Sequence, residues 1–266
     1  MNEICLEYLS ASEADPIRLA HIAKANDCRL ISVKLGPTED VVHRNLVHDA
    51  AARRAFKDVC EDLGVSVDLI ESLNVLPDTD LAQYRPMFEV GAFLGAPQIN
   101  AQLRRDDNLQ RGLDHLAEVC AMAAEYDMEV VLEISRAGLA REPWGMVELL
   151  KRANLPNVRM MIDVMHFLRF GQTLDGLAEL GPWIGRAQLC DGPAIAPQDQ
   201  LWEAVHERLP PGEGDFPLKE FLAAMPDGIT IGVEVPQDAK QAAGVDAETR
   251  VAHMMACARR VMGQAA

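Results

Sequence analysis

The sequence lacks the features that would place it at once in several common classes of protein. Its six cysteines form no CxxC pair, so we expect reduced thiols in apolar surroundings and neither a zinc knuckle nor a disulfide framework. There is no run of about 18 consecutive apolar residues, so no membrane-spanning helix is expected. Nothing resembles a phosphate-binding loop or a dinucleotide fingerprint, and no Ser-His-Asp order stands out.

Basic residues are scarce. The chain has 25 Lys and Arg against 41 Asp and Glu, which gives a formal net charge of −16. Such a surface repels a phosphate backbone, so no nucleic-acid partner is expected. The first residues contain neither a basic region nor a long apolar stretch. We therefore expect no signal peptide and a cytoplasmic protein without a membrane partner.

The chain does contain a regular alternation of two kinds of segment. Short apolar or β-branched runs predict eight strands, at Ile4–Leu9, Leu30–Leu35, Val65–Ser72, Gln98–Ala101, Glu129–Ile134, Val158–Asp163, Ile184–Cys190 and Thr230–Val235. Segments of helical periodicity follow them, at Asp15–Ala25, Asp40–Leu63, Leu81–Leu94, Asn108–Glu125, Pro143–Ala153, Thr173–Leu180, Leu218–Met225 and Ala247–Met262. This alternation indicates a parallel sheet covered by helices. Eight such units in 266 residues favour an α/β fold of the (β/α)8 TIM barrel type, with residues 1–266 as a single domain.

One long segment, residues 191–217, fits neither pattern and contains five prolines. A loop of this length on a compact domain is usually functional and often acts as a lid, and a passive excursion is the alternative.

Candidate functional residues stand where four consecutive predicted strands end. Glu133, Asp163, Gln188 and Glu234 each place an oxygen-bearing side chain among apolar neighbours. In a (β/α)8 barrel the working residues lie at the carboxyl ends of the strands, so these four are expected to converge. Each alone could be a half-exposed residue at the end of a strand, and the joint pattern carries the argument.

Electrostatics predicts a cation among these side chains. Three carboxylates buried together repel one another unless a cation lies between them. Carboxylate and carboxamide oxygens suit a hard divalent ion such as Mn²⁺ or Mg²⁺, and Zn²⁺ or Co²⁺ are the other ions considered. Glu133, Asp163, Gln188 and Glu234 are therefore the predicted metal ligands.

Two further side chains are candidates for contact with a substrate. His166 follows Asp163 by three residues and could contact a substrate hydroxyl or oxyanion, or add a ligand to the metal. Arg208 lies in the proline-rich segment and could direct a guanidinium at an anionic or polyhydroxyl substrate. An ordinary loop histidine and an ordinary surface arginine are the alternatives.

The order of these residues resembles the xylose isomerase-like barrel superfamily of sugar and sugar-phosphate isomerases and epimerases. The resemblance spans roughly residues 91–236 and rests on Glu133, Asp163-Val164-Met165-His166, Gln188-Leu189-Cys190-Asp191, Pro211-Gly212-Glu213-Gly214 and Glu234. It differs at the seventh strand, where many members carry His in a His-x-Lys-Asp-like run and this chain has Gln188 and Cys190.

The resemblance implies an activity and roles for the residues. Glu133 and Glu234 would ligate the metal and also act as acid and base, so that α-proton transfer in a polyhydroxy ketone passes through a metal-stabilised enediolate. His166, Arg208 and Asp191 are then the expected substrate contacts, with His166 also counted among the catalytic residues. A homodimer is expected by analogy with the family.

Other functions are kept as alternatives. A dehydratase acting on a cyclic keto-polyol would need the same base, with His166 as the acid that protonates the departing hydroxyl. A non-catalytic ligand-binding barrel is a third reading. The superfamily also contains DNA repair nucleases with a His-rich site of several zinc ions. Only seven histidines and a net charge of −16 argue against that activity here.

Overall fold

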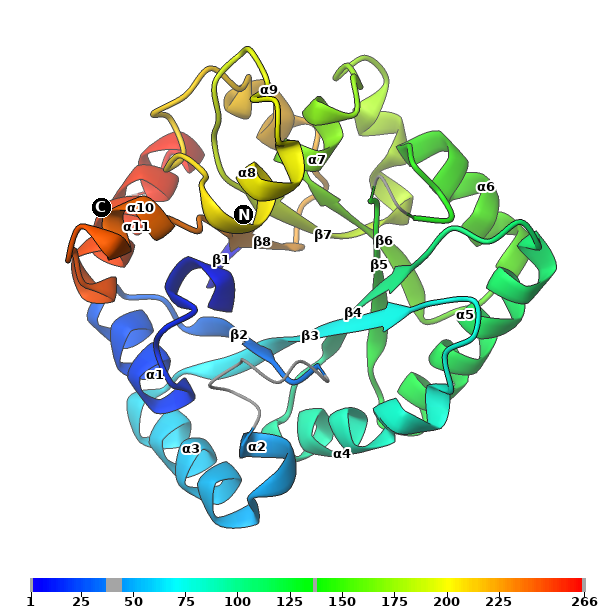
Figure 1. Ribbon diagram of the computed structural model, residues 1–266, viewed down its shortest axis with the longest axis horizontal. Helices are drawn as coiled ribbons and strands as arrows, with labels where there is room; N and C mark the ends of the chain where they lie inside the picture. The colour runs from blue at the N-terminus through cyan, green and yellow to red at the C-terminus, as the bar shows by residue number, and fades with distance from the viewer. Residues whose placement is uncertain (1, 37–44, 136–137, 265–266) are drawn as a thin grey trace.

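Eight parallel strands close into a barrel in the computed structural model, which describes residues 2–36, 45–135 and 138–264. Each strand pairs with the next along the chain, and β8 closes the ring by pairing with β1 (Figure 1). The strands are β1 Glu3–Leu6, β2 Leu30–Lys34, β3 Ser66–Val75, β4 Gln98–Leu103, β5 Glu129–Glu133, β6 Val158–Asp163, β7 Ile184–Leu189 and β8 Thr230–Val233. The predicted (β/α)8 barrel is confirmed.

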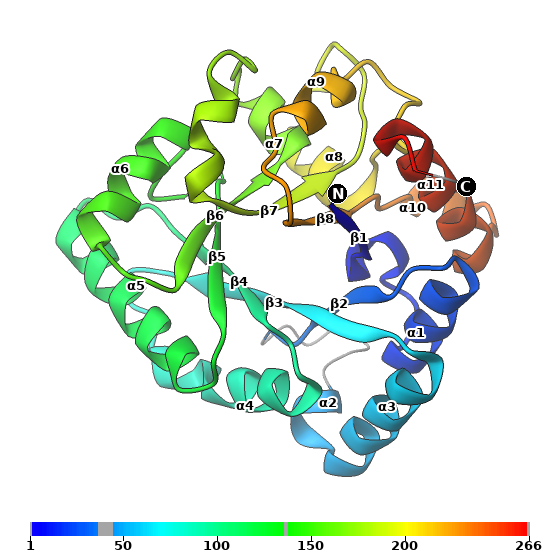
Figure 2. The same cartoon turned by 180° about the vertical axis from the view of Figure 1, so that it is seen from behind.

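Helices surround the ring of strands in both views of the ribbon (Figures 1 and 2). They are α1 Pro16–Ala25, α2 Asn45–His48, α3 Ala50–Leu63, α4 Arg85–Leu94, α5 Leu109–Ala124, α6 Pro143–Ala153, α7 Val164–Arg169, α8 Gln200–His206, α9 Leu218–Ala223, α10 Asp238–Ala242 and α11 Ala247–Met262. Short 3-10 helices add η1 Tyr8–Ala11, η3 Leu81–Tyr84 and η4 Leu177–Trp183. Within the described ranges, none of the helices has the length and apolar character that crossing a membrane would require.

Several predicted boundaries are wrong, and local hydrogen bonds explain some of the differences. The first strand ends at Leu6 instead of Leu9, because Tyr8–Ala11 turns into η1. The start of the predicted helix Asp40–Leu63 lies outside the described residues. Its remainder is split at Asp49, whose carboxylate accepts hydrogen bonds from two backbone amides and begins α3. The helix predicted at Thr173–Leu180 is instead the 3-10 helix η4.

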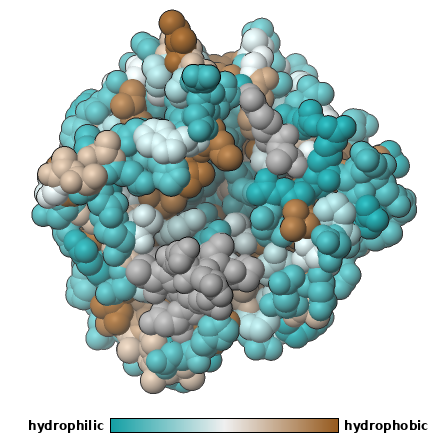
Figure 3. All heavy atoms as spheres, in the orientation of Figure 1, coloured by the Kyte–Doolittle hydropathy of each residue, from teal (hydrophilic) through white to brown (hydrophobic). Residues whose placement is uncertain are grey.

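The proline-rich segment 191–217 also differs from its prediction. It contains α8, which begins where the Asp199 carboxylate accepts a hydrogen bond from Trp202 N. Leu201, Trp202 and Val205 of this helix are exposed. The surface that faces the viewer in Figure 1 is hollowed near its centre in the space-filling view (Figure 3). Whether residues 191–217 act as a lid stays a prediction.

A buried ionic layer lies inside the barrel. Arg186 of β7 is fully buried, and its guanidinium is 3.0 Å from Glu7 Oε1 and 2.6 Å from Asp68 Oδ2. A buried charge is costly unless it is paired, and here two carboxylates surround the guanidinium and compensate its charge. The ion pair with Arg186 also holds Glu7 in place, and the other oxygen of Glu7 accepts a hydrogen bond from Gln188.

Gly232 of β8 provides the space that the Glu7 carboxylate occupies. A Cβ atom at this position would lie 1.8 Å from Glu7 Oε1. We expect Gly232→Ala to displace Glu7 from Arg186 and to lower the free energy of unfolding by about 1–3 kcal/mol, the usual cost of overpacking. Urea unfolding measures the loss. Gly181→Ala is the control, because its Cβ would meet only Pro226, at 3.8 Å. Equal stability of the two variants would contradict this account.

Candidate functional site

The four predicted ligands all lie at the carboxyl ends of neighbouring strands. Glu133 ends β5, Asp163 ends β6, Gln188 is the next-to-last residue of β7 and Glu234 directly follows β8. Each is buried, with between 2% and 7% of its surface exposed. Strand register explains part of this arrangement, since Asp163 is paired with Gln188 across β6 and β7.

Glu133 is held by two amide side chains from β4. Its Oε2 accepts hydrogen bonds from Asn100 Nδ2 at 3.0 Å and from Gln102 Nε2 at 2.6 Å. The other oxygen, Oε1, is 3.5 Å from His166 Nε2. His166 in turn stacks on Phe170, with the ring centroids 5.7 Å apart. The structure therefore brings His166 next to Glu133. The two side chains could exchange a proton, or both could contact the same substrate hydroxyl.

Asp163 links the end of β6 to the start of α7. Its Oδ1 accepts hydrogen bonds from Met165 N at 2.7 Å and His166 N at 3.2 Å, which caps the helix. Its Oδ2 is 2.7 Å from Arg208 Nη1. Burial raises the pKa of Asp163, but the charges of Arg208 and His166 and the hydrogen bonds outweigh it, so the pKa lies below its usual value.

Arg208 lies inside the site, with only 3% of its surface exposed. One nitrogen pairs with Asp163, and Nη2 is 3.0 Å from Glu234 Oε2. Its Nε donates to Ala204 O at 2.8 Å. The guanidinium thus bridges two predicted metal ligands. That Arg208 also contacts a substrate stays a prediction.

Gln188 has one satisfied and one unsatisfied end. Its Nε2 donates to Glu7 Oε2, while Oε1 is buried and has no hydrogen-bond partner among the described residues. A buried carbonyl oxygen without a partner is unusual and calls for an ion, a water or a ligand. An amide oxygen and the carboxylates of Glu133, Asp163 and Glu234 have the chemistry that suits a hard divalent cation. These are the residues that would hold it. Among the described residues, the barrel carboxylates whose oxygens already lie within 4.8 Å of one another are those of Glu7, Glu71 and Glu234, so Glu133 and Asp163 would have to draw closer to share one ion with Glu234.

Glu7 and Glu71 belong to the same region and were not predicted as site residues. Oxygen atoms of Glu7, Glu71 and Glu234 lie within 4.8 Å of one another, and all three side chains are buried. The signal that identified Glu133, a carboxylate inside an apolar run, is present around Glu7 and Glu71 as well. Applying it to the first and third strands would have found them.

Crowding of these carboxylates disfavours their charged forms. Burial, followed by the charge of Glu7, raises the pKa of Glu71 to about 8. Burial also raises the pKa of Glu234 well above its usual value, against the opposing charge of Arg208. A cation bound among these groups would relieve the same repulsion.

Glu71 makes the stability of the metal-free protein dependent on pH. Its pKa rises from 4.5 to about 8 on folding, so the folded state keeps a proton that the unfolded chain releases. This contribution is complete below pH 4.5 and is lost as the pH rises to about 8, at no more than about 1.4 kcal/mol per pH unit. In EDTA, Glu71→Gln should therefore weaken the decline in urea-unfolding free energy across this range. Exposed Glu61→Gln is the control, and an unchanged slope in Glu71→Gln would contradict the assignment.

Lys34 is a further residue that the sequence did not single out. It ends β2, and its Nζ donates to Ser72 Oγ at 2.7 Å and lies 5.7 Å from the centroid of the Tyr8 ring. Burial lowers its pKa, against the charges of Glu71, Glu133 and Glu234. Its position was hard to anticipate, because a lysine at the end of a strand is usually solvated.

Asp191 is placed beside the site but binds the loop that follows β7. Its Oδ1 accepts hydrogen bonds from Gly192 N at 2.8 Å and Phe216 N at 3.0 Å, and its Oδ2 accepts one from Gly212 N at 2.8 Å. Both oxygens are therefore engaged in shaping residues 192–216. A role in substrate binding stays a prediction for Asp191.

Comparison with known proteins adds the family. The chain matches the family model described as xylose isomerase-like TIM barrel over residues 20–260. No curated protein sequence matches it.

Solved structures share the fold at low identity. The IolI protein with a bound zinc atom is 17% identical with a TM-score of 0.81, and the match covers 98% of each chain. D-psicose 3-epimerase in the presence of D-fructose is 15% identical with a TM-score of 0.75, covering 98% of this chain and 99% of the other. The probable 3-DHS dehydratase AsbF of Bacillus anthracis is 17% identical with a TM-score of 0.78, covering 100% of each chain.

Proposed function

Because the chain belongs to the xylose isomerase-like TIM barrel family, we propose that it is a metal-dependent isomerase or epimerase of a polyhydroxy ketone. The observation that carries the proposal is the pair of buried carboxylates at the carboxyl ends of β5 and β8, Glu133 and Glu234, together with the buried oxygen of Gln188 at the end of β7 that has no partner among the described residues. Inverting the configuration of a carbon next to a ketone requires one group that removes its proton and another that delivers a proton to the opposite face, and this pair could supply both.

A divalent cation held by Glu133, Asp163, Gln188 and Glu234 would polarise a carbonyl and so acidify the neighbouring C–H bond. The proton transfers themselves would be carried out by side chains of the protein. One of the two glutamates removes the proton α to the carbonyl, and the other returns a proton to the resulting enediolate, to the same carbon from the opposite face in an epimerisation.

The surrounding contacts keep both carboxylates in place. Asn100 and Gln102 fix Glu133 through two hydrogen bonds, and Arg208 fixes Glu234 through an ion pair. Side chains that are already fixed in place lose little conformational entropy on reaching the transition state, and this preorganisation favours catalysis. His166, next to Glu133, is positioned to contact a substrate hydroxyl.

Related structures support the class of reaction. One of them is a D-psicose 3-epimerase with D-fructose, and another is a probable dehydratase. These names belong to the related proteins and not to this chain. The class of substrate proposed here, a ketone next to hydroxyl-bearing carbons, is consistent with them.

Solvent-deuterium incorporation tests the proposal. The protein is loaded with Mn²⁺ and incubated in deuterium oxide with a panel of keto-sugars, and exchange at the carbon α to the ketone is followed by NMR. We expect exchange in at least one sugar and its loss after treatment with EDTA. No exchange with any member of the panel, with the metal bound, would contradict the proposal.

A dehydratase is the second candidate, and His166 is the observation that favours it. An acid 3.5 Å from Glu133 could protonate a hydroxyl that departs after the α-proton is removed. Such a reaction on a cyclic keto-polyol would leave an enone that absorbs ultraviolet light. An epimerase would release no such product.

A further inference from the structure

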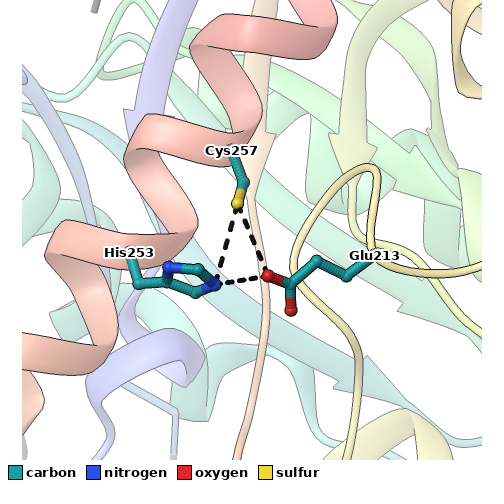
Figure 4. Close-up of side chains that lie close together, drawn as sticks. All are labelled: Glu213, His253 and Cys257. Carbon is teal, nitrogen blue, oxygen red and sulfur yellow. Dashed lines mark hydrogen bonds and ion pairs between the residues drawn. The ribbon is translucent and has the colours of Figure 1, made fainter.

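A second group of metal-binding side chains lies outside the barrel mouth. His253 and Cys257 are four residues apart and so share one face of α11. Glu213 reaches them from the loop that follows α8 (Figure 4). Its Oε1 is 2.5 Å from His253 Nε2 and 3.9 Å from Cys257 Sγ, and these nitrogen and sulfur atoms are 3.8 Å apart.

We propose that Glu213, His253 and Cys257 form a zinc site that is separate from the barrel centre. A thiolate, an imidazole and a carboxylate are the side chains that bind Zn²⁺, whereas Mg²⁺ and Mn²⁺ prefer oxygen ligands alone. Three protein ligands would leave the fourth tetrahedral position for a water molecule. The thiolate and the carboxylate together would neutralise the two charges of the ion.

The distances are close to those of such a site. Tetrahedral Zn²⁺ with ligands at about 2.0 and 2.3 Å places nitrogen and oxygen roughly 3.3 Å apart and sulfur roughly 3.5 Å from either. The sulfur atom already lies 3.8 and 3.9 Å from its two neighbours. The contact between His253 and Glu213 must lengthen and the two sulfur contacts must shorten slightly, and the His253 and Glu213 side chains are exposed enough to move, at 48% and 37%.

The geometry argues against a catalytic triad in the same three residues. A triad needs the carboxylate on one ring nitrogen and the thiol on the other, so that a proton can be relayed across the imidazole. Here the Glu213 carboxylate and the Cys257 thiol both face Nε2 of His253. Convergence on one point suits a metal ion.

The charges near the Cys257 thiol affect the pH at which the site can bind zinc. Burial and then Glu213 raise the pKa of Cys257, while Arg260 and Lys240 oppose them. Binding of Zn²⁺ requires the thiolate and therefore releases a proton. The affinity for zinc should rise with pH.

A metal here would fasten the loop after α8 to α11. Glu213 N donates to Pro210 O at 3.0 Å, and the neighbouring Gly212 N donates to Asp191. The same loop begins beside Arg208, whose guanidinium bridges Asp163 and Glu234. The ion would thus stabilise the loop next to the barrel mouth without touching the substrate.

Cobalt substitution tests the proposal and separates it from the barrel site. The full-length protein is titrated with Co²⁺, and the charge-transfer absorption from thiolate to cobalt is recorded in the near ultraviolet. The residues proposed to hold a metal in the barrel include no cysteine, so this band reports a thiolate ligand outside that set. We expect the band in the wild type, its bleaching by Zn²⁺ in excess of both sites, and its loss in Cys257→Ser and His253→Ala.

Matched variants decide the outcome. Cys190 is the thiol beside Arg208 at the barrel mouth, 3.7 Å from Nη1, so Cys190→Ser should keep the band. Glu133→Gln should keep it as well, whether or not that variant is active. Circular dichroism establishes that each variant is folded. A wild type without the band, a band that survives in Cys257→Ser, or a band lost in Cys190→Ser would each overturn the proposal.

Discussion

Replacing Glu234 by Gln is expected to lower turnover by about 10²- to 10⁴-fold, the usual contribution of a general acid or base. The amide keeps the size of the side chain and a carbonyl oxygen for the metal. It cannot accept or return a proton, and it removes the ionic partner of Arg208, 3.0 Å away. The rate of deuterium exchange in the reactive keto-sugar is the measurement.

A buried glutamate outside the site provides the matched control. Glu203 is 4% exposed and pairs with Arg169 at 2.7 Å, as Glu234 pairs with Arg208. Glu203→Gln should lose stability but keep turnover within a few-fold of the wild type. If both variants lost turnover equally, the loss would report a disturbed fold, and the acid–base role of Glu234 would be rejected.

Replacing Arg208 by Met should destabilise the metal-free protein by about 3–5 kcal/mol, because it leaves buried charges without a partner. The guanidinium contacts Asp163 Oδ2 at 2.7 Å and Glu234 Oε2 at 3.0 Å. Saturating Mn²⁺ should restore part of the loss, since a cation bound by the same carboxylates replaces the missing positive charge. Urea unfolding in EDTA and in Mn²⁺ measures both effects.

Arg169→Met is the control for that experiment. It also breaks a buried ion pair, and the partner in that pair, Glu203, is not a proposed ligand. Its stability should gain no more from Mn²⁺ than that of the wild type. An equal gain in Arg208→Met and Arg169→Met would show that the metal does not bind beside Arg208.

The barrel and the positions of its four polar strand ends could be predicted because both depend on local patterns. Alternating apolar runs and helical periods set the element order, and the carboxyl ends of parallel strands must meet at one face. Glu133, Asp163, Gln188 and Glu234 are therefore found where periodicity alone places them.

The remaining parts of the site depend on contacts between distant segments. Arg208 is 45 residues from its partner Asp163, and Arg186 is 179 residues from Glu7. No sequence period encodes such pairings. The helix α8 was missed for a different reason, because the prolines on either side of it hid a segment of only seven residues.

Glu7 and Glu71 are, like the predicted carboxylate ligands, carboxylates within apolar runs. They bring a second possible position for a cation, around the compact group that they form with Glu234. The motifs of the family resemblance lie on or after strands five to eight, whereas Glu7 follows the first strand of the barrel and Glu71 lies on the third. Only the position of a bound ion distinguishes the two sites.

The most direct test is a crystal structure of the protein grown with Mn²⁺, with an anomalous difference map collected at the manganese edge. We predict a peak within about 2.0–2.3 Å of oxygens from Glu133, Asp163, Gln188 and Glu234. Gln188 Oε1 should be among the ligands, since it is a buried oxygen at the end of β7 that has no hydrogen-bond partner in the described part of the chain; Glu71 Oε1, in the group with Glu7, is another such oxygen. A peak held instead by Glu7 and Glu71, or no peak at saturating Mn²⁺, would contradict the central claim.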